Sequence, residues 1–435
     1  MQPQTSKPTI LLLGAGYANI ALLKSLPKST YTHAHFTLIT DSSAYCESVL
    51  LHEVASGYRG SEILHPLTAI LSSIPSLEII QDRVQTICAH EKRVLCANGS
   101  YDYDTLIVGL GFRSDSFGIA GVEKHALPLT SFTQARAIYE RICENLNHYA
   151  RTQDTAYLRI VVCGGGFSGC ELVATLAQEL PKLARQRGIQ EPFELICVEA
   201  LPNVLPMFSK TLAQKGRAYL EKLGVIVRSS CRILACEEGG IIVQDSSSPQ
   251  AQNLESTSQN SGADLEGGNS SEKITSFCVI WTAGVQGSEV MAHSFGTPKS
   301  RVQTTPYLHP KSLESALKQS PESKISCQSA PIDTESIFIL GDCSALLDPD
   351  SNRFYPPTAQ MAIAQGRYVA GVLASKLAGS TSAPAPFTYA PQGTICSLGS
   401  RYGVGLLGAS FQISGVAAIA IKRASEWRWR FKLKH

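Results

Sequence analysis

The sequence has no pair of cysteines spaced as Cys-x-x-Cys, although its 435 residues include 13 cysteines. This absence excludes the zinc ribbons and thioredoxin-like dithiols that such a pair would indicate. No apolar run reaches the roughly 18 residues that a membrane-spanning helix needs. Neither sign of charge is in excess, since 38 basic residues face 36 acidic ones, which gives no signal for nucleic acid. We therefore expect a globular protein of two or three domains whose thiols are reduced.

What the sequence does contain is two glycine-rich turns, each between an apolar strand and a helix. The first is Gly14-Ala-Gly16 after the run 10–13, and the second is Gly164-Gly-Gly166 after the run 158–162. In such a turn one glycine allows a tight bend, another lets backbone N–H groups approach a phosphate, and a helix N-terminus faces the anion. Two of these turns predict two dinucleotides, so that one cofactor can pass electrons to the other.

The order of elements predicts an α/β fold with two Rossmann-like dinucleotide-binding domains and a small C-terminal membrane-associating region. A strand at 10–13, a helix at 17–26 and a strand at 35–39 form the first βαβ unit. Two polar segments interrupt the pattern. We expect 245–273 to be a disordered loop, because it has too few apolar side chains to offset its ordering entropy, and 309–335 to be a similar surface excursion.

Six further stretches carry a resemblance to a known family: 51–57, 117–121, 198–202, 281–284, 340–343 and 355–360. The last stretch, continued to Gln365, matches the pattern AQxxxQ. With these stretches the chain resembles the type II NADH:quinone oxidoreductases, which are single-subunit flavoproteins. The resemblance implies an FAD-binding domain at 1–125 and 335–378, an NADH-binding domain at 126–334 and a C-terminal region at 379–435 for membrane or dimer contact.

The resemblance assigns the first glycine turn to FAD. The pyrophosphate would lie at Gly14 and Gly16, and the carboxylate of Asp342 near the ribityl chain. Asn19 replaces the third glycine of the motif, which weakens the motif taken alone. Either Asp41 or Thr40 would contact the ribose. The full set of expected FAD-binding residues is Gly14, Gly16, Ala18, Asp41, Gly111, Gly341, Asp342, Ala359 and Gln360.

The second turn is assigned to NADH. Glu199 ends the second strand of its βαβ unit, where a carboxylate accepts hydrogen bonds from both ribose hydroxyls and repels a 2′-phosphate. NADH is therefore expected in preference to NADPH. The expected NADH-binding residues are Gly164, Gly166, Phe167, Ser168, Glu171, Glu199 and Gly284.

Three residues are expected to serve the reaction itself: Glu171, Gln360 and Gln365. Glu171 would either position the cofactors or relay protons, the second role requiring a raised pKa. The two glutamines lie about 140° apart on a helix, so they need not share a face. The resemblance implies that Gln360 lies at the flavin ring and Gln365 nearer the quinone, where neutral amides bind oxygens at little desolvation cost.

The C-terminal segment 422–435 holds six Lys or Arg residues, one Glu and two of the three tryptophans. Basic and aromatic residues together suit an anionic lipid surface. They alternate with period two, so a helix would not separate them into two faces. We expect a peripheral, monotopic enzyme on the cytoplasmic face of the inner membrane, a membrane quinone as substrate, and a homodimer.

Alternative functions differ in the residues that they need. A disulfide reductase needs a cysteine pair near the flavin, but Cys46 stands alone. A sulfide:quinone oxidoreductase needs cysteines converging there, for which Cys163, Cys343 and Cys396 are the candidates. A ferredoxin or rubredoxin reductase would not need the AQxxxQ pattern, and a non-enzymatic FAD-binding scaffold would not need Glu171.

Overall fold

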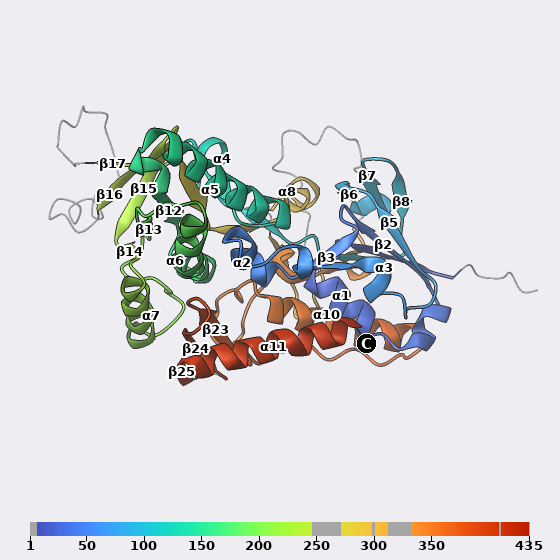
Figure 1. Ribbon diagram of the computed structural model, residues 1–435. Helices are drawn as coiled ribbons and strands as arrows, with labels where there is room; N and C mark the ends of the chain where they lie inside the picture. The colour runs from blue at the N-terminus through green and yellow to red at the C-terminus, as the bar shows by residue number, and fades with distance from the viewer. Residues whose placement is uncertain (1–6, 246–270, 298–300, 312–331, 409, 435) are drawn as a thin grey trace, which may run out of the picture.

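The computed structural model describes residues 7–245, 271–297, 301–311, 332–408 and 410–434. Two parallel sheets of five strands each form the centres of two α/β units that lie side by side (Figure 1). The prediction of two Rossmann-like domains is therefore confirmed.

The first sheet has the strand order β21–β9–β1–β2–β5, and all its neighbouring strands are parallel. Helices α1 and α10 pack together against one face of this sheet. The glycine turn joins the end of β1 directly to the start of α1. The bounds are β1 (Thr9–Leu13), β2 (His35–Thr40), β5 (Leu77–Gln81), β9 (Thr105–Val108), β21 (Ile337–Ile339), α1 (Tyr17–Ser25) and α10 (Ala359–Leu377).

Strand β1 is buried from both faces, which explains its continuous apolar run. Ile10 and Leu12 belong to the core beneath α1 and α10. Leu11 and Leu13 belong to a second core, which a three-stranded sheet and helix α8 cover. The covering elements are β6 (Val84–Cys88), β7 (Arg93–Cys96), β8 (Ser100–Asp102) and α8 (Glu289–Phe295).

The second sheet repeats this arrangement with the order β11–β18–β12–β13–β14. Helices α5, α6 and α7 contribute to the core on one face, and an antiparallel sheet of β15, β16 and β17 covers the other. The bounds are β11 (Leu127–Pro128), α5 (Phe132–Thr152), β12 (Arg159–Cys163), α6 (Phe167–Gln186), β13 (Glu194–Val198), α7 (Lys210–Lys222), β14 (Ile226–Arg228), β15 (Cys231–Glu237), β16 (Gly240–Asp245), β17 (Glu272–Thr275) and β18 (Cys278–Trp281).

The expected loop at 245–273 is shorter at both ends than the composition suggested. Asp245 closes β16 and Glu272 opens β17, and these two strands pair with each other. Asp245 and Glu272 are polar, as in a loop, but pairing between strands holds both of these ends of the segment in the sheet. Residues 246–270 lie outside the described residues, as do 312–331 of the second polar segment.

The described residues 285–297 and 301–304 pack with the first unit, whereas the sequence placed them in the second. Strand β19 (Val285–Gly287) pairs with β10 (Phe112–Ser114), and β20 (Val302–Thr304) pairs with β22 (Ser344–Leu346). Met291 and Phe295 of α8 are fully buried in the core behind β1. These residues lie within the range 126–334 predicted for the second domain, but the chain makes contacts with the first unit directly after Gly284.

A three-stranded antiparallel sheet and one long helix end the chain. The elements are β23 (Gly393–Ser397), β24 (Gly403–Leu407), β25 (Phe411–Gly415) and α11 (Val416–Lys434). Helix α11 runs along the base of both units and ends beside α1 and α10 (Figure 1). In the described ranges no helix combines the length and the apolar character that crossing a bilayer requires.

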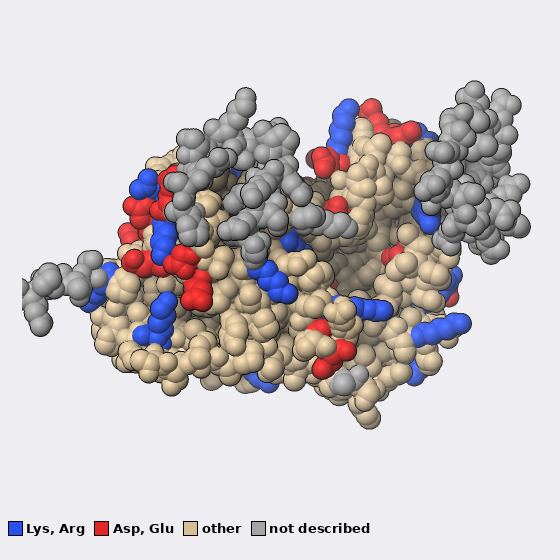
Figure 2. All heavy atoms as spheres, turned by 180° about the vertical axis from the view of Figure 1, so that it is seen from behind, with Lys and Arg blue, Asp and Glu red and all other residues tan. Residues whose placement is uncertain are grey.

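Charged side chains form small groups of both signs on the face turned away from Figure 1 (Figure 2). This dispersion agrees with the formal net charge of +2. Short elements complete the described chain: β3 (Ala44–Cys46), α2 (Leu51–Ala55), β4 (Leu64–Pro66), α3 (Leu67–Ile70) and α4 (Val122–His125).

Candidate active site

A cavity of about 540 Å³ lies between the two units, and both glycine turns open into it. Residues from the first and the second predicted nucleotide site line the same space, although they come from elements far apart in the sequence. The predicted residues in its wall are Gly16, Ala18, Gly111, Gly341, Asp342, Ala359, Gly166, Phe167, Ser168, Glu171 and Gly284.

The first turn is built so that the chain can pass close to its neighbour. Gly14 has a φ of +86°, and a β-carbon there would lie 2.5 Å from the carbonyl oxygen of Gly109. Gly16 precedes α1 and leaves the helix N-terminus without a side-chain cap. Free N–H groups at a helix N-terminus, next to a glycine turn, fit the pyrophosphate of a dinucleotide.

Asn19 strengthens this turn, although it replaces the third glycine of the motif. Its Nδ2 donates hydrogen bonds to the carbonyl oxygens of Leu13 (2.8 Å) and Gly14 (2.7 Å). The space for this amide comes from Gly109, where a β-carbon would lie 2.9 Å from Asn19 Nδ2. The sequence could not indicate this substitute, because Gly109, which directly follows β9, is far from Asn19 along the chain.

The two acidic residues expected near FAD lie in different surroundings. Asp342 lines the cavity, and burial raises its pKa to about 6 against the opposing charge of Arg301. A carboxyl group of this kind can both donate and accept hydrogen bonds near neutral pH. Asp41 follows β2 on the surface and is exposed, so the structure leaves it outside the cavity wall.

The second turn has all three glycines of the motif, and the third is sterically required. A β-carbon at Gly169 would overlap the carbonyl oxygen of Gly164 and lie 2.7 Å from Thr282 Oγ1. Gly164 itself has a φ of +110°. Helix α6 therefore starts in close contact with Thr282, which directly follows β18, and its N-terminal residues Phe167 and Ser168 line the cavity.

Glu199 lies directly beneath the second turn. Its Oε2 accepts a hydrogen bond from the N–H of Gly165 (2.6 Å), and its Oε1 accepts one from the N–H of Leu201 (2.8 Å). The carboxylate is thus next to the turn, as predicted, but it also holds the backbone of the turn in place. This second task was not visible in the sequence.

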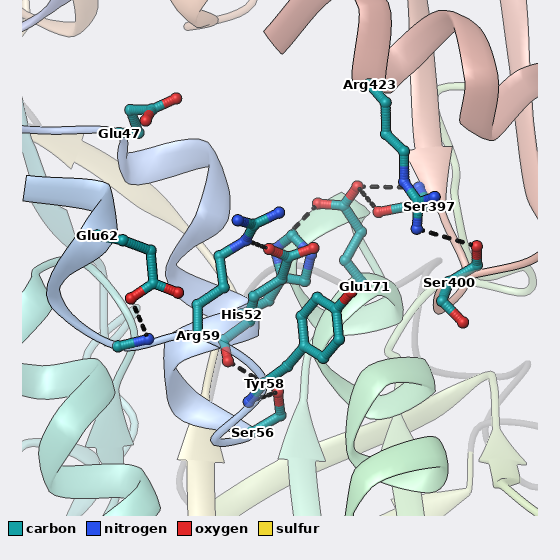
Figure 3. Close-up of polar contacts among 12 residues, drawn as sticks. Glu47, His52, Ser56, Tyr58, Arg59, Glu62, Glu171, Ser397, Ser400 and Arg423 are labelled. Atoms are coloured by element: carbon teal, nitrogen blue, oxygen red, sulfur yellow. Dashed lines mark hydrogen bonds and ion pairs between the residues drawn. The ribbon is translucent and has the colours of Figure 1, made fainter. Parts of the chain in front are cut away.

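Glu171 is the centre of a buried polar network that joins four elements (Figure 3). Its Oε1 accepts hydrogen bonds from the N–H (2.9 Å) and the Oγ (2.8 Å) of Ser397 in β23, and from Nζ of Lys422 in α11. Its Oε2 lies 3.7 Å from Nδ1 of His52 in α2. His52, Glu171 and Lys422 all line the cavity. Sequence reasoning missed Lys422 and Ser397, and counted Lys422 only as part of a basic tail.

The charges of this network argue against Glu171 as a proton donor. Burial raises the pKa of Glu171, but the charges of Lys422 and His52 and the hydrogen bonds from Lys422 and Ser397 together outweigh burial and leave this pKa below its ordinary value. Burial lowers the pKa of Lys422, but the charge and hydrogen bond of Glu171, with smaller contributions from the charges of Glu426 and Cys396, together outweigh burial, so the pKa of the lysine is raised. Burial lowers the pKa of His52. The raised pKa that proton donation by Glu171 requires is therefore absent, and the ammonium of Lys422 holds the proton.

The two glutamines lie outside the cavity wall, although Ala359 is part of it. Gln365 is buried, and its Oε1 accepts a hydrogen bond from the N–H of Gly341 (2.6 Å). Gln360 is exposed and donates to the carbonyl oxygen of Gly393 (3.0 Å). The two side chains point to different sides of α10, as expected. Gln365 contacts the Gly341 turn, and its position does not favour the expected contact with a quinone.

Comparison with known proteins agrees with this geometry. The pattern of the family "Pyridine nucleotide-disulphide oxidoreductase" matches residues 8–366. The chain is 33% identical, over 98% of its length and 95% of the relative's, to the type II NADH:quinone oxidoreductase of Staphylococcus aureus.

Two solved structures share the fold. NDH2 from Plasmodium falciparum in complex with NADH has a TM-score of 0.78 at 15% identity, with 98% of this chain and 97% of that chain covered. The sulfide:quinone oxidoreductase of Aquifex aeolicus has a TM-score of 0.72 at 16% identity, with 98% of this chain and 91% of that chain covered.

Proposed function

The chain belongs to the type II NADH:quinone oxidoreductases of the pyridine nucleotide-disulphide oxidoreductase family, and we propose that the cavity between its two units carries electrons from NADH through FAD to a quinone. The observation behind this proposal is that both glycine turns open into one space of about 540 Å³. In the test, the purified holoenzyme is mixed with NADH and a short-chain quinone. NADH should bleach the flavin absorbance and quinol should then form, whereas a flavin absorbance unchanged by NADH would overturn the proposal.

The residues of the first unit fit a bound flavin. FAD, when present, supplies a two-electron carrier between the hydride donor and the quinone. Gly14, Gly16 and the N-terminus of α1 would hold its pyrophosphate, and Asp342 would contact its ribityl hydroxyls. Gln365 acts here as a positioning residue, because it holds the Gly341 turn on which Asp342 stands.

The residues of the second unit would hold NADH. Gly164, Gly166 and the N-terminus of α6 would bind its pyrophosphate, and Glu199 its ribose. Phe167 and Ser168 would lie beside the nicotinamide end, since they line the shared cavity.

Glu199→Gln is expected to raise KM for NADH by roughly tenfold, since a hydrogen bond to a charged group contributes about 1.5–3 kcal/mol. The ratio of NADPH to NADH use should rise as well, because the repulsion of a 2′-phosphate is removed. The matched control is Glu191→Gln, an exposed carboxylate just before the same strand. If the ratio of NADPH use to NADH use were unchanged in Glu199→Gln, a group other than Glu199 would bind the ribose hydroxyls.

Quinone reduction also takes up two protons, and Lys422 is the group proposed to supply one at the cavity. Its Nζ donates hydrogen bonds to Glu171 and to Ser397 Oγ (2.8 Å), which fix it at the wall. Pro357, Thr358 and Ile395 lie in the same wall and give it a partly apolar surface. Glu171 thus positions the ammonium and keeps it protonated.

The cysteines favour the quinone reductase over a sulfide oxidase. Cys163, Cys343 and Cys396 are all buried and free. Within the described ranges, no cysteine lines the cavity, and burial raises the pKa of each of these three thiols. Sulfide oxidation at a flavin needs reactive thiolates, which these surroundings do not provide.

Attachment to a membrane is proposed through the outer face of α11. Trp427 and Phe431 are 68% and 52% exposed, and their rings are 5.8 Å apart. Arg428 and Lys432 are exposed on the same helix. Exposed rings among cations suit the headgroup region of an anionic membrane.

Replacing Trp427 and Phe431 together by serine should weaken binding to vesicles of phosphatidylglycerol and phosphatidylcholine by roughly tenfold or more. Co-sedimentation with the vesicles measures the loss, and turnover with a short-chain quinone should persist. Point substitutions are preferable to deletion of 422–435, which would also remove Lys422 from the cavity. Undiminished sedimentation of the double variant would place the membrane contact elsewhere.

A homodimer and a cytoplasmic location complete the proposal. Phe411 at the start of β25 is 67% exposed and Val416 at the start of α11 is 71% exposed, and the two offer an apolar surface for a second copy. Sedimentation velocity of the Phe411→Ser variant tests this contact. The free cysteines of the described residues suit a reducing compartment, and thus the cytoplasmic face of the membrane.

A further inference from the structure

A second pocket, of about 280 Å³, lies on the outer side of the first unit, where the end of α11 meets α1 and α10. Figure 1 shows these three helices side by side near the C-terminus. Each helix contributes one cation to the pocket: Lys24 from α1, Arg367 from α10 and Lys432 from α11. The cavity between the two units does not include any of these three residues.

The three cations share the pocket without a carboxylate. No Asp or Glu is among its lining residues, and in the part of the chain that the structure describes none of the three forms an ion pair. The pKa of Lys432 is lowered by burial and by the charges of Arg367 and Arg428, and burial lowers the pKa of Lys24. The like charges of Lys432 and Arg367 are therefore held near each other, and Lys24 is partly buried beside them, at a cost that a bound anion would reduce.

Aromatic rings complete the wall of this pocket. Trp429 and Phe431 line it, and the indole N–H of Trp429 donates to the hydroxyl of Tyr45 (2.8 Å), which fixes the ring. The side chain of Phe431 is 52% exposed. A volume of 280 Å³ equals that of roughly nine water molecules at about 30 Å³ each, which is room for a small phosphate-bearing group.

We propose that Lys24, Arg367 and Lys432 form a site for the phosphodiester of an anionic phospholipid headgroup, with Trp429 and Phe431 beside its glycerol. The proposal rests on the attachment to an anionic membrane proposed above and adds a defined site to it. A phospholipid is favoured over a free phosphate because the pocket adjoins the exposed rings of α11, which suit the depth of the headgroups. In such a site the headgroup fixes the end of α11 against α1 and α10.

The probe for this site is dihexanoyl phosphatidylglycerol, added to the holoenzyme below its micelle concentration. Fluorescence of Trp429 is followed in the Trp427→Phe background, where the remaining tryptophan, Trp281, is buried. We expect a saturable change, a Kd at least roughly tenfold higher in Arg367→Ala or Lys432→Ala, and no saturation with dihexanoyl phosphatidylcholine. Lys434→Ala and Lys28→Ala are the matched controls, since both lysines are exposed near the pocket's elements without lining it.

Two outcomes would overturn the proposal. Equal weakening in the pocket variants and in Lys434→Ala would mean that the lipid responds only to diffuse surface charge. Glycerol phosphate binding as tightly as the lipid would mean that the site takes a free phosphate. Turnover of NADH with a short-chain quinone is recorded in each variant, and it should stay at the wild-type rate. A failure of that turnover in the wild type would refute the proposed activity without bearing on the lipid titration.

Discussion

Lys422→Met is expected to slow reduction of the quinone by roughly a hundredfold or more, because a positioned proton donor contributes about 10²–10⁴ in rate. The ammonium lines the cavity and is held by Glu171 and Ser397. The glycine turns are untouched, so transfer of hydride from NADH should be nearly unchanged. Stopped-flow measurement of the two half-reactions separates these effects, since only reoxidation of the flavin by quinone should become slow.

Two further variants distinguish the loss of the proton donor from a loss of protein stability. Lys422→Met leaves the carboxylate of Glu171 buried without a cation, which costs about 3–5 kcal/mol of stability. Combining it with Glu171→Gln removes that unpaired charge, so stability should recover while reoxidation stays slow. Lys434→Met, on the exposed end of the same helix, removes the same charge elsewhere. Slowing of both half-reactions to the same extent would contradict the assigned role.

The pH dependence of the Glu171→Gln variant tests whether Glu171 sets the pKa of Lys422. In the wild type the pKa of Lys422 is raised, so the ammonium is present at neutral pH and is lost only as the pH rises through that raised value. Without the carboxylate, burial dominates and lowers the pKa of the lysine. The alkaline limb of the rate of quinone reduction should therefore move to lower pH. A limb in the same place as in the wild type would show that Lys422 does not supply the proton.

Gly169→Ala is expected to raise KM for NADH at least roughly tenfold and to lower stability by about 1–3 kcal/mol, because the helix must move to admit the methyl group. A β-carbon there would overlap the carbonyl oxygen of Gly164 and crowd Thr282 Oγ1. Gly164 belongs to the second glycine turn and Thr282 directly follows β18, so a shift of either one moves the N-terminus of α6. Steady-state kinetics and thermal unfolding measure the two effects, and the FAD content should remain that of the wild type.

The control for this substitution is Gly371→Ala. Gly371 lies in α10, and a β-carbon there would have no neighbouring atom within 4 Å. Replacing an exposed helical glycine by alanine should leave KM unchanged and raise stability by about 0.5–1 kcal/mol. If Gly169→Ala behaved like Gly371→Ala, the second turn would not be the NADH cradle.

The sequence predicted those parts of the site whose geometry depends on neighbouring residues in the chain. A strand, a glycine turn and a helix N-terminus are contiguous, so the segment 10–26 and the unit that begins at 158 indicated both glycine turns. The family pattern also named Asp342 and Ala359 as FAD-binding residues, and both line the cavity next to a turn. Local rules of this kind need no knowledge of the rest of the fold.

Contacts between distant segments were the ones that the sequence did not provide. Lys422 and Glu171 are 251 residues apart, and the last helix must fold back across both units before they meet. Gln365 fits the family pattern AQxxxQ, but the direction of its side chain depends on where the Gly341 turn lies, 24 residues earlier. The sequence assigned 285–304 to the second domain, and only the burial of Met291, Phe295 and Val302 behind β1 shows that its described residues pack with the first unit.

By itself the sequence determined two dinucleotide cradles and their family, because spacing along one chain fixes a strand–turn–helix unit. Only the tertiary structure decided the charge state of Glu171 at the candidate active site. Whether Glu171 carries a proton depends on the charge that packs against it, and that charge is supplied by a helix at the other end of the chain. The proton therefore rests on Lys422, since an ion pair in a buried site stabilises the ionised form of both partners.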